Sequence, residues 1–221
     1  GVDGFSVEDY EKNLHHHIPD LVERLKAKRY RAKPVKRVYI PKEGGKLRPL
    51  GLPSVEDKLV QLTATRILEA IYEADFIKNS YGYRRGKSAH DALDRIQRYA
   101  TFDKVGYVVE ADIRGFFDSM DHGWLMKMLA ERVEDRAFLN LIGKWLKAGI
   151  LETDGKMVNP ATGTPQGGII SPILANIYLH YALDLWFEKV VKKYCRGKAF
   201  LIRYADDCAP RRRKQEATMV N

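Results

Sequence analysis

An acidic pair stands directly after an apolar stretch, where a charged side chain needs a physical reason. Residues 200–205 read FLIRYA and run straight into Asp206 and Asp207. Two adjacent ionised aspartates repel each other, and the arrangement becomes favourable when a divalent cation supplies the compensating charge. Taken alone, an Asp-Asp pair is more often an ordinary polar turn. The segment is therefore a candidate metal site that needs a second observation.

A third acid supplies that observation. Residues 105–112 read VGYVVEAD, and this apolar run predicts a buried strand that ends at Asp112. Phosphoryl transfer uses a shared metal centre of this kind, in which one Mg²⁺ activates an attacking hydroxyl and a second neutralises the triphosphate and the leaving oxygen. We therefore expect Asp112 to lie beside Asp206 and Asp207 in the folded chain.

The composition favours a polyanionic partner. Lys and Arg total 38 against 29 Asp and Glu, which gives a formal charge of +9 and a pI near 9.4. This balance suits nucleic acid, although any basic globular protein has the same property. No apolar run reaches membrane-spanning length. Cys195 and Cys208 are too few for a disulfide framework and lack zinc-binding spacing, so we expect a reducing cytoplasm.

Capping signals and periodicity predict the elements that must position the acids. Ser6 and Asp9 indicate a helix start, and Pro19 is expected to divide that helix from a second one. Strands over 35–41 and 47–52, joined by a glycine turn, predict a basic β-hairpin.

Helical spacing marks most of the remaining chain. Helices are predicted after Ser54 and Ser88 and over 124–131, 136–148 and 174–186, with a final strand over 199–204. The fold class is α+β with an antiparallel sheet.

Several motifs resemble those of one enzyme family. The run Tyr204-Ala205-Asp206-Asp207 resembles the reverse transcriptase signature, with Asp112 in the place of the first catalytic acid. Further segments resemble motifs of bacterial group II intron reverse transcriptases and maturases in the same order: IPK at 40–42, RPLGLP at 48–53, SYGYR at 80–84, DIRGFFD at 112–118, TPQGG at 164–168 and SP at 171–172. The resemblance extends from Gly1 to Asp207.

The resemblance implies a right-hand polymerase with fingers and palm, an antiparallel palm sheet packed on helices, and no thumb. Fingers are expected over 1–104, with N-terminal helices, the basic hairpin and further helices, and a palm with the catalytic carboxylates over 105–207. Residues 208–221 depart from the family pattern. Because Pro210 and the four cations after it are poorly suited to a central strand, we expect an atypical basic tail that is disordered or ends a shortened reading frame.

The resemblance also assigns site residues. The catalytic acids would be Asp112, Asp206 and Asp207, and these three with Ile113 would contact two Mg²⁺ ions, for which Mn²⁺ could substitute. Nucleotide-binding roles fall on Lys42, Arg48, Phe117, Gln166 and Ala205. Template or RNA contacts fall on Tyr81, Tyr83, Arg84, Arg85 and Lys87.

Each nucleotide-binding role has an ordinary structural alternative. Lys42 and Arg48 would clamp the triphosphate, but surface hairpins commonly carry such cations. Phe117 would obstruct a ribose 2′-hydroxyl while Phe116 enters the core, provided that the strand continues past Asp112, although a reversed register would exchange the two rings. Gln166 would lie beside nucleotide and template, or simply in a glycine-rich loop. Ala205 would leave room for the primer end, or only fit a compact turn.

The function that the resemblance implies is RNA-directed DNA polymerisation on an RNA template from a DNA or RNA primer and deoxynucleotides, in a bacterial cytoplasm. Intron RNA would be a further partner, and an exposed sheet edge could allow a homodimer. Two alternatives remain. The chain could be a non-catalytic splicing cofactor that binds intron RNA, or a retron-like or CRISPR-associated reverse transcriptase.

Overall fold

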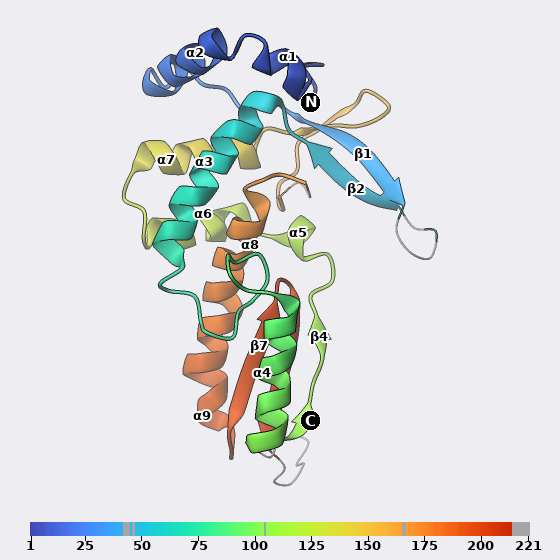
Figure 1. Cartoon of the computed structure of the whole chain (residues 1–221), viewed down its shortest axis with the longest axis vertical. Coiled ribbons are helices and arrows are strands. Elements are labelled where there is room, and N and C mark those ends of the chain that lie inside the picture. Colours follow the sequence, from blue (N-terminus) through green and yellow to red (C-terminus); the bar gives the residue numbers. More distant parts are fainter. Residues whose placement is uncertain (42–44, 46, 104, 165–166, 214–221) are drawn as a thin grey trace. The chain divides into compact units, whose positions relative to one another are not determined.

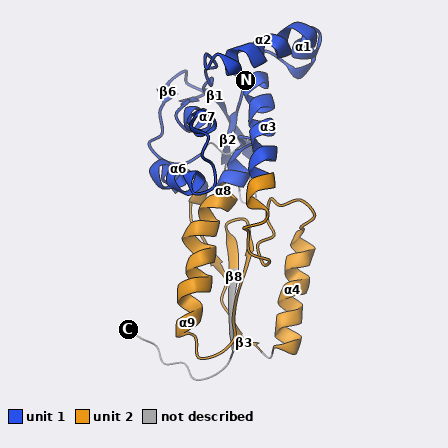
Figure 2. Ribbon diagram, turned by 90° about the vertical axis from the view of Figure 1, so that its left-hand side faces the viewer, with its two compact units in different colours: residues 1–69, 117–174 blue, residues 70–116, 175–221 orange. Residues whose placement is uncertain are grey.

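The chain passes twice through each of two structural units. A computed structural model describes residues 1–41, 45, 47–103, 105–164 and 167–213. Unit 1 comprises Gly1–Glu69 and Phe117–Leu174, and unit 2 comprises Ala70–Phe116 and Ala175–Asn221 (Figure 2). The predicted division into fingers up to residue 104 and palm from residue 105 concerns functional regions and not these two units, and it stays a prediction.

A four-stranded sheet lies in unit 1, in the order β2-β1-β5-β6. β1 (Val35–Pro41) and β2 (Leu47–Leu52) form the antiparallel hairpin that the sequence predicts, with Val38 opposite Leu50 (Figure 1). Of the predicted glycine turn, Gly44 lies outside the described residues. β5 (Ile150–Leu151) pairs parallel to β1 and antiparallel to β6 (Met157–Val158).

Helices complete unit 1. Those that begin in it are α1 (Val7–Glu11), α2 (Leu14–Lys26), α3 (Val55–Tyr72), α6 (His122–Ala130), α7 (Arg136–Leu146) and α8 (Ser171–Leu179). Aspartate side chains cap two of them, because Asp121 accepts a hydrogen bond from the Trp124 amide and Asp135 accepts from the Ala137 amide.

The N-terminal helices confirm one prediction and correct another. Ser6 caps α1 by accepting a hydrogen bond from the Asp9 amide, as expected. Pro19 does not divide the helices: it lies inside α2, and the break falls before Leu14, at Asn13. A proline removes one helical hydrogen bond without ending the helix when the neighbouring turns remain packed.

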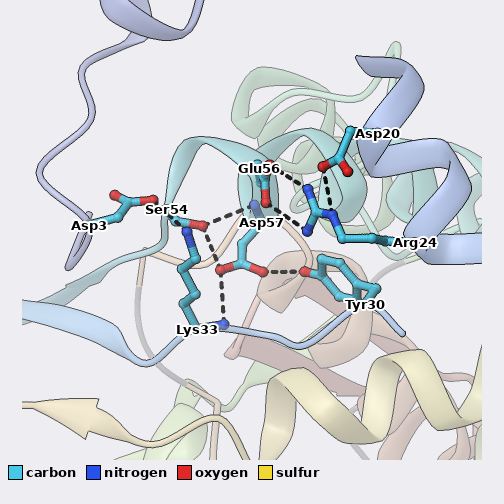
Figure 3. A network of polar contacts seen from close by, with 8 residues as sticks. All are labelled: Asp3, Asp20, Arg24, Tyr30, Lys33, Ser54, Glu56 and Asp57. Carbon is cyan, nitrogen blue, oxygen red and sulfur yellow. Dashed lines mark hydrogen bonds and ion pairs between the residues drawn. The ribbon is translucent and has the colours of Figure 1, made fainter. Parts of the chain in front are cut away.

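A polar network ties α2, the start of α3 and the segment between α2 and β1 together (Figure 3). The buried Asp57 carboxylate accepts hydrogen bonds from the Tyr30 hydroxyl, from the Ser54 hydroxyl at 2.7 Å and from the Lys33 amide at 3.2 Å. The indole of Trp145 in α7 donates to the Tyr30 hydroxyl at 3.0 Å. Burial and the neighbouring Asp57 charge raise the pKa of Tyr30, so the hydroxyl stays protonated and can donate.

Arg24 adds an ion pair to this network. Its guanidinium donates to both oxygens of Glu56, at 2.7 and 3.2 Å, and to Asp20 at 2.7 Å (Figure 3). A planar guanidinium matches a carboxylate in this two-bond geometry. The first turn of α3 is thereby joined to α2.

The sheet of unit 2 is built around its last strand. β8 (Asp207–Arg213) pairs antiparallel with β7 (Ala199–Tyr204) on one side, and with β3 (Val105–Val108) and β4 (Ala111–Asp112) on the other. α4 (Ala89–Phe102) begins with the predicted Ser88 cap, which forms a capping box with Asp91. Figure 1 shows α4 lying along β7, with which it is in contact.

β7 is buried because helices cover both of its faces. Ile202 packs with Tyr81 and with Ala92 of α4. Leu201 packs with Phe187, which belongs to the long helix that continues α8. That helix contains two π-helical segments, η2 (His180–Asp184) and η3 (Phe187–Val191), and ends with α9 (Lys192–Tyr194). Successive side chains of a strand point to opposite faces, so Leu201 and Ile202 pack against different helices.

The structure overturns two expectations about this sheet. The run 105–112 is not a buried strand: it is interrupted between β3 and β4, and Tyr107, Val108 and Val109 are exposed. Nor is the segment after Asp207 only a tail, since residues 207–213 form the central strand β8. Residues 214–221 lie outside the described residues.

Pro210 fits this central strand because of the interruption next to it. On the β3 and β4 side, Arg211 pairs with Val108 and Cys208 pairs with Ala111, and the strand pairing is interrupted between these two pairs. The missing N–H of a proline is tolerated where a ladder is locally broken.

Among the described residues, no helix combines the length and the apolar composition needed to cross a membrane.

We predict that Tyr30→Phe lowers the free energy of unfolding by about 1–3 kcal/mol, because it leaves the buried Asp57 carboxylate and the Trp145 indole short of a partner. Urea unfolding measures the change. Arg29→Ala is the control, since it breaks only the exposed pair with Glu23 and should cost under about 1 kcal/mol. Equal costs for the two variants would contradict the role given to the network.

Candidate metal-binding active site

The three predicted acids meet at one end of the β4–β8–β7 sheet. Asp112 in β4 and Asp207 in β8 are direct partners in the antiparallel register, and Tyr204 in β7 faces Asp207 from the other side. Directly opposite residues in such a pair have Cα atoms about 4.5–5.5 Å apart. Asp206 precedes Asp207 in the turn. The structure thus brings together the acids of two segments that are nearly a hundred residues apart in sequence.

These carboxylates act on one another electrostatically. The pKa of Asp207 is raised from its ordinary value, first by partial burial and then by the charges of Asp206, Asp112 and Glu110. Glu110 lies in the interruption between β3 and β4 and was not among the expected site residues. A concentration of negative charge that raises a pKa in this way is the environment that a divalent cation would relieve.

The turn that carries the acids has an unusual backbone. Ala205 and Asp206 form a two-residue connection between β7 and β8, and Ala205 adopts a positive φ of 58°. A positive φ at the first central residue is the pattern of a type II′ hairpin turn, where glycine is the ordinary choice. An alanine in this region carries backbone strain on the order of 1–3 kcal/mol. Strained backbone of this kind clusters at functional sites.

The donor chemistry of this sheet end fits a hard divalent cation. Carboxylate oxygens are the ligands that Mg²⁺ prefers, and Asp112, Asp206 and Asp207 supply them. Within the described ranges, no three Asp, Glu, His or Cys side chains are grouped closely enough to hold an ion as they stand. Like charges repel, which gives carboxylates without a counter-ion a reason to lie apart. The carbonyl of Ile113 accepts a hydrogen bond from the Phe116 amide at 3.3 Å, and its second lone pair remains for another partner.

The segments that carry the predicted nucleotide-binding residues belong to unit 1, except for Ala205, which belongs to unit 2. Arg48 lies exposed on β2, whereas Lys42 and Gln166 lie outside the described residues. The loop before Gln166 touches the helix α5 (Phe116–Ser119), because the Thr164 amide donates to the Phe117 carbonyl at 2.8 Å.

Glycines let this loop approach its neighbours closely on both sides of Gln166. A Cβ on Gly163 would lie 2.7 Å from the Phe117 carbonyl oxygen. A Cβ on Gly167 would lie 2.8 Å from the carbonyl oxygen of Gly51 in β2, and the φ of Gly167 is +103°. The backbone therefore links the strand of Arg48, the helix of Phe117 and the loop of Gln166.

Phe116 and Phe117 differ in burial as predicted, but they lie in a helix and not in the strand that was expected. Phe116 is buried and packs edge-on against Tyr178, with ring centroids 6.1 Å apart, and Phe117 is partly exposed. The expected continuation of the strand is wrong, because the chain turns at 114–115 and both rings belong to α5. The role of Phe117 toward a sugar stays a prediction.

The five residues predicted to contact template fall into two groups. Tyr83, Arg85 and Lys87 are exposed. Tyr81 is buried against Ala92 and Ile202, and its hydroxyl accepts a hydrogen bond from Arg95.

The side chain of Arg84 is only 5% exposed. It donates to the carbonyls of Ile77 and Ser80 and forms an ion pair with Glu73. These contacts favour a structural role for Arg84 and Tyr81.

Three buried polar residues next to the acid turn were missed from the sequence. Arg203, Asp184 and Asn176 are fully buried and bonded to one another through the Arg203 guanidinium. A signal for them was present, because each interrupts an otherwise apolar run: FLIRY at 200–204, ALDLW at 182–186 and LANIY at 174–178. Polar residues in buried runs are rarely without a partner.

Solved structures of polymerases share this fold. Apo telomerase from Candida tropicalis matches with a TM-score of 0.62 at 13% identity, over 90% of this chain and 44% of that one. Telomerase from Candida albicans with a fragment of telomeric RNA matches with a TM-score of 0.60 at 12% identity, over 94% of this chain and 43% of that one. At such low identity the likeness concerns the fold alone. The fold is that of a right-hand polymerase of the α+β class.

Sequence comparison narrows the class. The family described as "Reverse transcriptase (RNA-dependent DNA polymerase)" matches residues 40–216. The chain belongs to the reverse transcriptase family, whose members generally use divalent metal ions.

Among its relatives is the group II intron-encoded protein LtrA of Lactococcus lactis subsp. cremoris, 42% identical over 195 residues, which cover 88% of this chain and 31% of LtrA. Protein YkfC of Escherichia coli K12 is 37% identical over 202 residues, covering 90% of this chain and 52% of YkfC. The resemblance to group II intron reverse transcriptases and maturases is confirmed. The chain spans about a third to a half of the length of these two relatives.

We predict that Asp207→Asn leaves the protein as stable as the wild type or more stable at pH 7 in chelator, because it relieves repulsion with Asp112 and Asp206. The difference in free energy of unfolding between variant and wild type should narrow as the pH falls through the raised pKa of Asp207. The reason is that Asp207 takes up a proton at a higher pH in the folded wild type than in the unfolded chain. Mg²⁺ should raise the melting temperature of the wild type and not of the variant. Equal Mg²⁺ stabilisation of both proteins would contradict metal binding at this carboxylate.

Proposed function

We propose that this chain carries the catalytic acids of an RNA-directed DNA polymerase of the group II intron type. The observation that carries the proposal is the register that sets Asp112 opposite Asp207, beside Asp206. The reaction is attack of a primer 3′-hydroxyl on the α-phosphate of a deoxynucleotide paired with an RNA template, with pyrophosphate as the leaving group. Membership of the reverse transcriptase family supports this reaction.

In this proposal the three aspartates, with the Ile113 carbonyl, hold two Mg²⁺ ions. When bound, the ions supply activation of the 3′-hydroxyl and neutralisation of the charge that develops on the phosphates; Mn²⁺ is the expected substitute. The protein contributes oxygen ligands on paired strands, whose backbone hydrogen bonds fix their spacing before substrate arrives. Such preorganised electrostatics provide most of the acceleration in phosphoryl transfer.

The nucleotide-binding residues have separate tasks. Lys42 and Arg48 bind the triphosphate, because an ammonium and a guanidinium both suit phosphate oxygens. Phe117 excludes a ribose 2′-hydroxyl by its bulk, and Gln166 contacts the base pair being formed. The close contacts of Gly163 and Gly167 support these roles, because they anchor both sides of the Gln166 loop within unit 1. Ala205 is small enough to leave space for the primer end.

The exposed side chains of Tyr83, Arg85 and Lys87 favour a second function, the binding of intron RNA during splicing. Basic and aromatic side chains bind single-stranded nucleic acid through phosphate contacts and base stacking. One relative, 28% identical over 180 residues, is the nuclear intron maturase 2 of Arabidopsis thaliana. The two functions are compatible, since splicing requires only binding.

We predict that Asp206→Asn reduces primer extension with Mg²⁺ and deoxynucleotides by about 10²–10³-fold or more, equivalent to several kcal/mol of lost transition-state stabilisation. RNA binding should survive, because the change removes a negative charge. Asp94→Asn makes the same chemical change at an exposed position of α4 and should leave extension intact. Extension by the Asp206 variant at the wild-type rate would exclude the proposed active site.

We predict that Arg85→Ala and Lys87→Ala weaken RNA binding across sequences. Each change should lower the slope of log affinity against log salt concentration by about one unit per lost phosphate contact, or somewhat less on single strands. Filter binding at several salt concentrations measures the slope. Lys156→Ala removes an exposed lysine near β6 and serves as the control. An unchanged slope in both loop variants would assign RNA binding to another surface.

A further inference from the structure

Arg203 is a fully buried cation in β7, immediately before the residues of the acid turn. Its guanidinium donates to both carboxylate oxygens of Asp184, at 2.9 and 2.8 Å, and both side chains are completely shielded from solvent. Asp184 ends the π-helical segment η2 of the long helix. π-helical turns inside α-helices occur frequently at functional sites.

The remaining nitrogen of Arg203 reaches the turn itself. Nη1 donates to the backbone carbonyl of Ala205 at 2.9 Å and to the Asn176 side chain at 2.8 Å. Ala205 is the residue with the positive φ, and the two acids follow it. The Arg203 side chain therefore holds Ala205, the strained residue whose backbone conformation sets the orientation of Asp206 and Asp207.

Asn176 extends these contacts to a neighbouring segment. Its amide donates to the Gly82 carbonyl at 2.8 Å. Gly82 in turn lies so close to the turn that an added Cβ would be 2.1 Å from the Ala205 nitrogen. The Tyr81 amide donates to the Arg203 carbonyl at 2.8 Å, which adds residues 79–81 beside β7. The turn is thus held both by side-chain hydrogen bonds and by direct backbone contact.

Stability alone is a weak reason for such an arrangement. Burying two charges is costly, and a well-packed apolar pair of similar volume often serves the fold equally well. A bidentate ion pair instead defines geometry, because its two parallel hydrogen bonds fix the plane of the guanidinium. That plane sets the position of Nη1, and with it the position of the Ala205 carbonyl.

We propose that Arg203, Asp184 and Asn176 are positioning residues that hold the Ala205 turn in the one conformation from which Asp206 and Asp207 bind divalent cations. The proposal deepens the proposed function and rests on it. Arg203 touches neither metal nor substrate in this role. When the three side chains are lost, the turn relaxes toward an unstrained backbone and the acids lose the arrangement from which they bind an ion.

The test measures Mn²⁺ binding to the full chain without RNA or nucleotide, by electron paramagnetic resonance of the free ion. The main variant combines Arg203→Met with Asp184→Leu, which removes both charges and leaves no buried ion unpaired. Its affinity for Mn²⁺ should fall about tenfold or more relative to the wild type. Raising the Mg²⁺ concentration should restore part of the lost primer extension, because the acids themselves remain.

Two further variants separate positioning from general damage. Phe187→Leu loosens the core around Leu201, on the same face of β7 as Arg203, while the side chains of Arg203, Asp184 and Asn176 remain in place, and it should reduce stability while leaving Mn²⁺ affinity unchanged. Arg203→Lys keeps the charge beside Asp184 but lacks the fork that reaches Asn176 and Ala205. It should weaken Mn²⁺ binding, and it provides the test if the double variant fails to fold.

The outcomes separate the two proposals. If the wild type binds Mn²⁺, Asp206→Asn does not, and the Arg203 variants bind as the wild type does, the positioning role is overturned while the metal site stands. If wild type and Asp206→Asn bind alike, the proposed active site is itself wrong and the positioning role falls with it. Weakened binding in the folded Arg203 variants, with normal binding in Phe187→Leu, supports the inference.

Discussion

The pairing of β8 with strands on both of its sides is the constraint on which the candidate site depends. Hydrogen bonds to β4 set Asp207 opposite Asp112, and hydrogen bonds to β7 close the turn that contains Asp206. Carboxylates repel, so no attraction between the acids assembles them. The backbone ladder holds these like charges near one another, and the divalent cation of the proposed function would relieve their repulsion. Partial burial and, after it, the charges of Asp206, Asp112 and Glu110 raise the pKa of Asp207.

Local signals were sufficient to predict much of the fold. Ser6 and Ser88 lie where a helix N-cap is needed, and the hairpin of β1 and β2 was predicted from β-branched and aromatic residues on either side of two glycines. The acid pair was also visible, because an apolar strand that ends in carboxylates is unusual in any sequence. The motif order then pointed to a family in which such acids are catalytic. These inferences depend on residues near one another in the chain, where propensity and capping act directly.

The remainder depends on contacts that a sequence does not display. Pro19 remains within α2 although a proline normally weakens a helix, and Pro210 lies in a central strand because the ladder beside it is broken at that point. Exposure of the run around Val108 likewise depends on which faces of the sheet the helices cover. The missed Arg203 illustrates the same limit: a charge in an apolar strand was visible, but its partner Asp184 lies in the preceding helix, and the sequence does not show which side chains of that helix face the strand.

The chain order of the strands has a consequence for how the molecule is made. β8 follows β3, β4 and β7 in sequence, yet it is the strand that pairs with all three. During synthesis β3, β4 and β7 emerge before β8, so their backbone edges on that side have no strand to pair with until β8 is made. Long-range pairing of this kind slows folding and leaves intermediates open to aggregation. A nascent chain that has not yet produced β8 cannot place Asp207 opposite Asp112.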